Sequence, residues 1–181
     1  MISRPPAKAY LDLPERATGR LPPLLSQTGA LRDPAEPKLL VSENLIPYEL
    51  NVPFWSDGAV KARWVSVPQG AKVAFRAEGE WTFPPGTVFV KHFALTTDET
   101  RPDVTRRLET RLLVCDATGG VYGVTYKWRT DQRDADLLAT NLTEAIVITT
   151  ATGVRTQSWY YPSRQDCLTC HTALAGGVLG V

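Results

Sequence analysis

Residues that commonly bind metal ions or cross-link small folds are scarce in this sequence. Its 181 residues include three cysteines, two histidines and one methionine. A disulfide scaffold would have more cysteines in a shorter chain. We therefore expect the fold to depend on an apolar core, which a chain of this length can bury.

Long apolar runs and an excess of one charge are also missing. No segment approaches the roughly 20 apolar residues that span a bilayer, which argues against a membrane span. Lys and Arg number 20, Asp and Glu number 19, and the net charge is +1. This balance provides no electrostatic case for binding nucleic acid or an anionic membrane surface.

Prolines are concentrated near the N-terminus, where residues 1–53 hold nine of the fourteen. Proline fixes φ and removes a backbone donor, so long helices and central strands are disfavoured there. The same stretch contains apolar residues such as Leu25, Leu31 and Val41. We therefore expect residues 1–53 to form an extended arm with at most short helical turns, packed on a body formed by residues 54–181.

Segments rich in Val, Tyr, Phe, Trp and Thr predict β-strands in the body. Short turns such as those at residues 119–120 and 151–153 separate them, so neighbouring strands should be antiparallel. The expected fold class is mainly β, an antiparallel sheet or sandwich with a short C-terminal helix. The expected strands are residues 62–67, 71–75, 87–95, 108–115, 121–128, 145–150 and 154–161.

A helix is expected over residues 164–173. Ser163 and Asp166 have the spacing of a capping box, although Asp is a weaker reciprocal cap than Glu or Gln. Gly176 and Gly177 follow the expected helix and should terminate it.

This helix carries Cys167-Leu168-Thr169-Cys170-His171, a C-x-x-C-H sequence that indicates attachment of a c-type haem. Positions i, i+3 and i+4 of a helix share one face. The two thiols can thus bond the vinyl-derived carbons on one porphyrin edge, while the imidazole binds the iron. We expect one covalent haem c held by Cys167, Cys170 and His171.

Other interpretations of the motif are open. A zinc site could use Cys167 and Cys170 with further ligands from His92, Cys115 or His171, although adjacent Cys170 and His171 are awkward ligands for one ion. A thioredoxin-like redox pair would need a βαβ context, and this chain offers consecutive strands. The five residues could also match by coincidence.

The sequence leaves the second axial ligand of the iron open. Met1 is the only methionine, and His92 is the only histidine besides His171. Alternate residues of a strand face opposite sides, so only one of Lys91 and His92 can face the haem. His92 would give bis-His iron suited to electron transfer, whereas Lys91 would leave five-coordinate iron with a lysine in the distal pocket. The alternatives are a structural, hydrogen-bonded His92 and a Lys91 whose stem packs at a sheet edge.

Several segments, in order from about residue 22, carry a family resemblance. They are Leu25-Ser26-Gln27-Thr28-Gly29, Ile46-Pro47-Tyr48-Glu49-Leu50-Asn51, Phe54-Trp55-Ser56-Asp57-Gly58-Ala59, Trp81-Thr82-Phe83-Pro84-Pro85-Gly86-Thr87-Val88, Lys91-His92-Phe93, Leu108-Glu109-Thr110-Arg111-Leu112 and Tyr161-Pro162-Ser163-Arg164 leading into the C-x-x-C-H motif. Together they resemble an uncharacterised bacterial family of dihaem c-type cytochromes. Its members are often encoded near, or fused to, sugar-dehydrogenase-like proteins that use pyrroloquinoline quinone. Members continue into a second haem domain, so this chain, which stops at Val181, is expected to be at most the first.

The chain is also similar, more distantly, to the cytochrome P460 group, which includes the β-sheet type of cytochrome c-prime. The run from Phe83 to Lys91 and a C-x-x-C-H near the C-terminus fit that layout. In that group a lysine can cross-link to the haem, and five-coordinate iron reacts with small nitrogen compounds. The resemblance implies a comparable role for Lys91, although the segment that usually follows the haem motif is not evident in residues 172–181.

These observations predict a periplasmic electron-transfer domain whose redox partner is a dehydrogenase or another cytochrome. Residues 1–6 contain no apolar signal segment, so either the chain is cytosolic or a leader has been removed, and the haem motif favours the second. One alternative is a P460-like haem enzyme or small-gas binder. The other is a non-haem β interaction domain in which the motif is unused.

Overall fold

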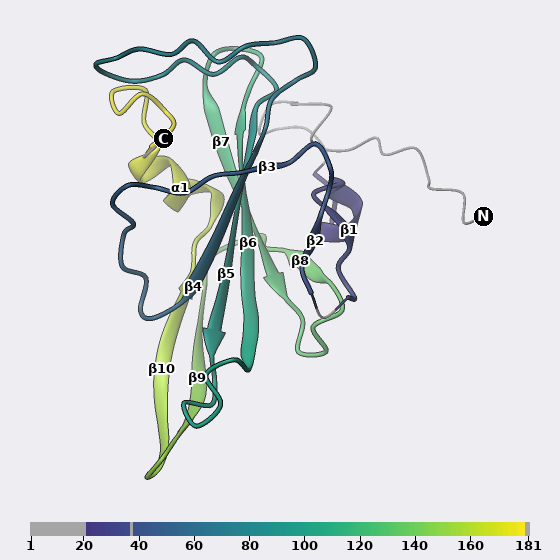
Figure 1. The fold of residues 1–181 in the computed structure, drawn as a ribbon, viewed down its shortest axis with the longest axis vertical. Helices are drawn as coiled ribbons and strands as arrows, with labels where there is room; N and C mark the ends of the chain where they lie inside the picture. Colours follow the sequence, from purple (N-terminus) through teal and green to yellow (C-terminus); the bar gives the residue numbers. More distant parts are fainter. Residues whose placement is uncertain (1–20, 37, 180–181) are drawn as a thin grey trace, which may run out of the picture.

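A six-stranded antiparallel sheet forms the centre of the protein (Figure 1). The computed structural model describes residues 21–36 and 38–179. Neighbouring strands follow the order β3-β4-β5-β6-β7-β8 and are all antiparallel. Their bounds are β3 Ile46–Pro47, β4 Val60–Ser66, β5 Val88–Thr96, β6 Thr105–Cys115, β7 Val121–Trp128 and β8 Ala135–Leu137.

One face of this sheet packs against the segment that precedes it. This segment contains the 3-10 helix η1 (Leu25–Thr28) and the paired strands β1 (Leu31–Asp33) and β2 (Leu40–Val41). Leu25 is fully buried in one core with sheet residues that include Leu112 and Trp128. Burying such a side chain contributes about 1.5–3 kcal/mol. The first twenty residues of the expected arm, and Pro37, lie outside the described residues.

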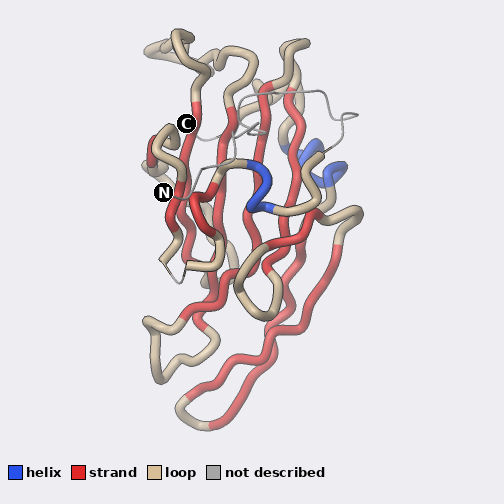
Figure 2. The backbone as a smooth tube through the Cα atoms, turned by 90° about the vertical axis from the view of Figure 1, so that its right-hand side faces the viewer, coloured by secondary structure: helices blue, strands red, loops and turns tan. Residues whose placement is uncertain are grey.

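The opposite face carries a β-hairpin and the C-terminal helix. Strands β9 (Leu142–Thr150) and β10 (Gly153–Tyr161) pair with each other and extend past the sheet at the lower end of Figure 1. Their inner side chains form a second core with Phe93 and Leu108 of the sheet. Helix α1 (Arg164–Cys170) follows β10 and contacts β7. Figure 2 shows η1 in front of the sheet and α1 behind it.

The expected fold class is confirmed, because antiparallel strands dominate and one short helix lies near the C-terminus. The expected strand at residues 71–75 is wrong, since only an isolated bridge joins Ala74 to Thr82. β4 and β5 pair directly with each other. The connection between them, which contains residues 71–75, therefore cannot insert between these two strands. The sequence missed β8 and also β1, β2 and β3, which lie in the arm expected to have at most short helical turns; strands of two or three residues are too short to show a clear alternation.

Among the described residues, no helix has both the length and the apolar character needed to cross a membrane.

Candidate functional site

Helix α1 begins at the capping box that the sequence predicts. The Asp166 N–H donates to Ser163 Oγ (3.2 Å), and the Ser163 N–H donates to Asp166 Oδ2 (2.8 Å). The hydroxyl of Tyr160, at the end of β10, donates to the same oxygen at 2.8 Å. These bonds, those from Ser163 above all, lower the pKa of Asp166 to about 2, so the carboxylate cap persists at neutral pH.

The helix ends at Cys170, earlier than the expected residue 173. The His171 N–H still donates to the Cys167 carbonyl at 3.0 Å, but a ψ of 59° takes His171 out of the helix. A turn over residues 172–177 follows, closed by a bond of 2.9 Å from the Gly177 N–H to the Thr172 carbonyl. The expected helix is too long because the chain turns back here.

That turn orients His171. The Nδ1 of His171 lies 2.7 Å from the Gly177 carbonyl oxygen, so Nδ1 carries the proton and Nε2 keeps its lone pair. Gly177 has a φ of 74°, which a residue with a Cβ adopts only with strain. Burial is the main cause that lowers the pKa of His171. The imidazole is therefore neutral at pH 7, the state that binds a metal ion.

Helix α1 rests on β7 at Gly123. A Cβ placed on Gly123 would lie 2.6 Å from the Cβ of Cys167 and 2.7 Å from its Sγ, so only glycine allows this approach. Cys167 is half-buried, Cys170 is exposed, and neither forms a disulfide. Two free thiols one helical turn apart, followed by an imidazole with an available Nε2, match the donor set that haem c requires.

The strand register places Lys91 on the face of the sheet that α1 covers. Lys91 pairs with Arg111 on β6. Leu113, two residues further along β6, pairs with Gly123 beneath α1. Residues two apart on a strand, and residues directly opposite on neighbouring strands, share a face. Lys91 therefore lies on the side of the C-x-x-C-H motif.

His92 lies on the opposite face, in the apolar core. It is 7% exposed, and its Nδ1 lies 2.8 Å from Thr110 Oγ1. The same oxygen accepts a bond of 3.0 Å from the Trp128 indole N–H. Burial, aided by the charge of Arg107, lowers the pKa of His92 to about 3. The structure separates His92 from the motif, so the expectation of His92 as a second iron ligand has no support from this arrangement.

Four basic side chains form a cluster on the α1 face of the sheet, which we call the basic row. They are Lys61 and Arg63 on β4, Lys91 on β5 and Arg111 on β6. Burial first, and then the neighbouring cations, lower the pKa of Lys91 to about 8. After burial, the charges of Lys91 and Arg111 also lower the pKa of His171, which places this end of the row near the imidazole of the motif.

A buried carboxylate anchors one end of the basic row. Glu109 is fully buried and accepts hydrogen bonds from Arg111 Nε at 2.9 Å and Nη2 at 2.5 Å. The Trp159 indole N–H donates to the same carboxylate at 3.2 Å. Arg111 is thereby held in one orientation beside α1, since a bidentate arginine–carboxylate pair is geometrically specific.

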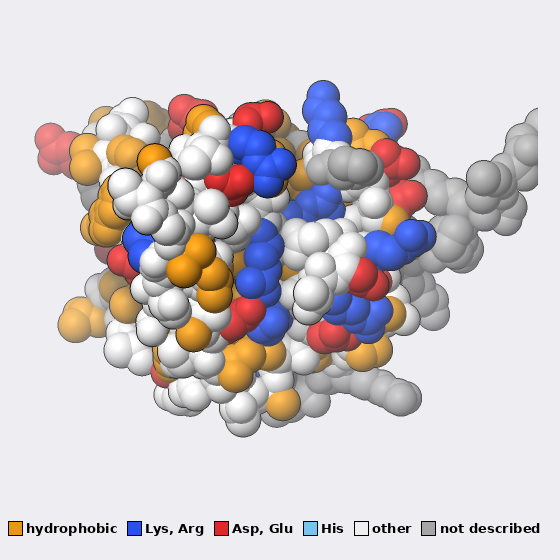
Figure 3. Space-filling view, turned by 90° about the horizontal axis from the view of Figure 1, so that it is seen from below, with side chains coloured by type: hydrophobic (Ala, Val, Ile, Leu, Met, Phe, Trp, Pro, Cys, Tyr) orange, Lys and Arg blue, Asp and Glu red, His pale blue; other side chains and the backbone are white. Residues whose placement is uncertain are grey.

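The lower surface outside this site carries no large patch of one sign. Figure 3 shows Lys and Arg side chains interspersed with Asp and Glu. Arg106 pairs with Glu144 and Arg155 pairs with Glu99. Surface pairs of this kind contribute little free energy, so the basic row is the more unusual feature of the molecule.

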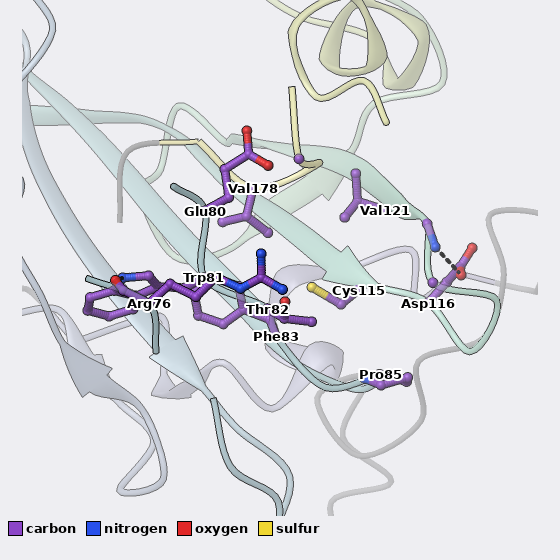
Figure 4. A pocket seen from close by; sticks show the side chains of 13 residues that line it. Arg76, Glu80, Trp81, Thr82, Phe83, Pro85, Cys115, Asp116, Val121 and Val178 are labelled. Carbon is purple, nitrogen blue, oxygen red and sulfur yellow. Dashed lines mark hydrogen bonds between the residues drawn. The ribbon is translucent and has the colours of Figure 1, made fainter. Parts of the chain in front are cut away.

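A separate cavity of about 220 Å³ lies beside the tail that follows His171 (Figure 4). Trp81 and Arg76 line one end and Asp116 the other, with Cys115 on the wall. Burial raises the pKa of Cys115 to about 11, so this cysteine remains a protonated thiol. Residues 21–36 and 38–179 contain no group of three or more His, Cys, Asp or Glu side chains that could share a metal ion.

Sequence reasoning missed Arg63, Glu109, Arg111 and Gly123 as parts of the site. Alternation along a strand shows that Arg111 and Glu109 share a face. It does not show which residues lie opposite them, because the pairing register is a property of the folded sheet. Gly123 within an apolar run was the one local signal, since a glycine inside a strand often marks a close approach.

Comparison with protein-family models, with curated proteins and with solved structures finds no match for this chain.

The contact between α1 and β7 can be tested with Gly123→Ala. The new methyl group would overlap Cys167, so α1 must shift, and we expect the free energy of unfolding to fall by about 1–3 kcal/mol. Gly120→Ala is the matched control, since its Cβ would lie 3.5 Å from the nearest atom, in the Asp116 side chain. Urea denaturation of both variants measures the difference, and an equal loss in both would contradict the proposed contact.

The buried His92 predicts a specific loss of stability in acid. Its folded pKa of about 3 lies below the ordinary value of 6.5, so the unfolded chain binds the proton first as the pH falls. Stability is complete above about pH 6.5 and is lost towards pH 3. The unfolding free energy of the wild type should therefore be higher at pH 7 than at pH 5. We expect His92→Gln to reduce this difference by about 1–2 kcal/mol.

Denaturant titrations at the two pH values measure this difference. His171→Gln is the control, because it removes the half-buried histidine and should flatten the pH dependence less. A His92→Gln variant with the wild-type pH dependence would show that His92 is not held neutral by burial.

Proposed function

We propose that this chain is a c-type cytochrome domain that holds one covalent haem c through Cys167 and Cys170, with His171 as an iron ligand. The supporting observation is the bond from His171 Nδ1 to the Gly177 carbonyl at 2.7 Å, which leaves Nε2 available beside two free thiols. When bound, haem supplies one-electron iron chemistry.

The residues around the motif would each have a defined part in this function. Cys167 anchors α1 on the sheet through Gly123, and Gly177 fixes the imidazole tautomer. No residue of α1 is fully buried, and Leu174 in the following turn is 97% exposed. A partner protein can therefore reach this side of the molecule. We infer that the domain carries single electrons in the periplasm for a redox partner, either a dehydrogenase or another cytochrome.

A second candidate is a P460-like haem enzyme or small-gas binder. The position of Lys91 favours it, because Lys91 shares a face with Cys167 while His92 does not. With a pKa of about 8, a fraction of Lys91 is neutral near pH 7 and available as a base or nucleophile. An open sixth position on the iron is the property that distinguishes this candidate from the electron carrier.

Replacing the motif cysteines tests the attachment. The chain is expressed in the periplasm together with cytochrome c maturation machinery, and haem is stained after denaturing electrophoresis. We expect the wild type to retain haem, Cys167→Ala and Cys170→Ala to retain less, and the double variant to retain none. Cys115→Ala is the matched control and should stain like the wild type. Haem retention by the double variant, or an unstained wild type, would overturn the attachment.

Gly177→Ala tests whether the carbonyl of Gly177 orients His171. The variant strains a left-handed residue and brings a Cβ within 3.2 Å of Val121 Cγ1. Gly119→Ala has similar backbone strain at φ 83° with open space around it, and both should lose roughly 1–2 kcal/mol of stability. We expect only Gly177→Ala to change the absorption spectrum of the matured protein. Identical spectra for the two variants would contradict an orienting role.

A further inference from the structure

Two neighbouring cations in the middle of the basic row have no hydrogen-bonded or ion-paired carboxylate among the described residues, although the charge of Glu109 acts on Lys91 from a distance. Arg63 is 8% exposed, and its Nη2 is buried with no hydrogen-bond partner among the described residues. The Lys91 ammonium lies 5.0 Å from the centre of the Phe93 ring and makes no hydrogen bond or ion pair to a described residue. Arg63 and Lys91 are directly opposite each other on β4 and β5. Like charges at such positions repel, and a buried guanidinium nitrogen without a hydrogen-bond partner costs folding free energy.

The two ends of the row are bonded differently. Lys61 Nζ donates to the Phe54 carbonyl and to Ser56 Oγ, while Arg111 pairs with Glu109. The four cations and one buried carboxylate leave an excess of three positive charges. The unsatisfied charge is therefore concentrated on the middle pair.

The space beside Arg63, which Lys91 does not line, suits a ligand that is both anionic and apolar. A hollow of about 360 Å³ lies between β4 and residues 47–53, with Lys61 and Arg63 in its lining. Glu49 lines the same hollow, but it is exposed and makes no bond to Arg63. Val52, Phe54 and Trp55, on the adjoining loop, are 73–81% exposed. A simple inorganic anion would leave these apolar side chains uncovered.

We propose that Arg63 and Lys91 bind the two propionate carboxylates of the haem, an inference that rests on the proposed function. The thioether-forming carbons and the propionates lie on opposite edges of the porphyrin. Cys167 sits over β7, whereas Lys91 and Arg63 lie on the second and third strands away from it. Each strand spacing is about 4.8 Å, so Lys91 and Arg63 lie two and three spacings from the strand beneath Cys167, on the side where the propionates would be held. A guanidinium fork matches a carboxylate geometrically.

The test compares iron protoporphyrin with its dimethyl ester. Each is titrated into the full-length apo-protein with its thiols reduced, and binding is followed by absorption. We expect the wild type to bind the diacid about 10- to 100-fold more tightly than the ester. In Arg63→Met and in Lys91→Met this ratio should fall towards one. Arg129→Met, which removes a surface charge paired with Asp136, is the matched control and should keep the wild-type ratio.

The thermal midpoints of the apo-variants separate a binding role from a structural one. Because the Nη2 of Arg63 is buried without a hydrogen-bond partner among the described residues, we expect Arg63→Met to be at least as stable as the wild type. A destabilised variant with unchanged discrimination would make Arg63 structural and overturn the inference.

The remaining outcomes separate this inference from the proposed function. Equal affinity of the wild type for diacid and ester would overturn the inference while leaving a haem domain. Arg63-dependent binding of inorganic phosphate, without discrimination between the porphyrins, would identify a small-anion site and also overturn it. Failure of the wild type to bind either porphyrin would count against the haem proposal itself.

Discussion

The pairing register of β5 with β4 and β6 decides which side chains can act together in this protein. Lys91 and His92 are consecutive, yet the pleat sends them to opposite faces. Apolar packing holds that register, because a slip by one residue would move His92 and the neighbouring valines out of the core. The same register aligns Arg63, Lys91 and Arg111 on the face where α1 contacts Gly123. The position of the basic row relative to the C-x-x-C-H motif is thus a consequence of sheet pairing.

The two faces of the sheet differ in how their polar and charged side chains are satisfied. The face that contains His92 packs against the N-terminal segment, and its polar groups form a closed network through Thr110 and Trp128. The α1 face combines Arg63, whose buried Nη2 has no hydrogen-bond partner among the described residues, with apolar side chains left in solvent on the adjoining loop. Each of these features costs stability in the apo-protein. Proteins keep such costs mainly at functional sites, which is why the α1 face is the more informative one.

Much of the fold could be predicted from the sequence because the signals were local. Strand composition and short turns identified the antiparallel body, and Ser163 with Asp166 identified the start of α1. The segment at residues 71–75 has the composition of a strand, but a strand also needs a neighbour, and none was available. Helix α1 ends at Cys170, and the turn that follows brings the Gly177 carbonyl to the His171 side chain, an interaction that helix propensity does not describe. The C-x-x-C-H motif was visible by spacing alone, whereas Arg63 joined the site only through cross-strand pairing.

The most direct measurement is the intact mass of the wild-type chain under denaturing conditions, after periplasmic expression with cytochrome c maturation machinery. The proposed function predicts a mass equal to the polypeptide plus one haem, with no unmodified chain in the folded, coloured fraction. A folded protein with the mass of the bare polypeptide, or with two hydrogens fewer from a disulfide between Cys167 and Cys170, would contradict it. The β-body would then have to be explained as a binding domain in which the motif is unused.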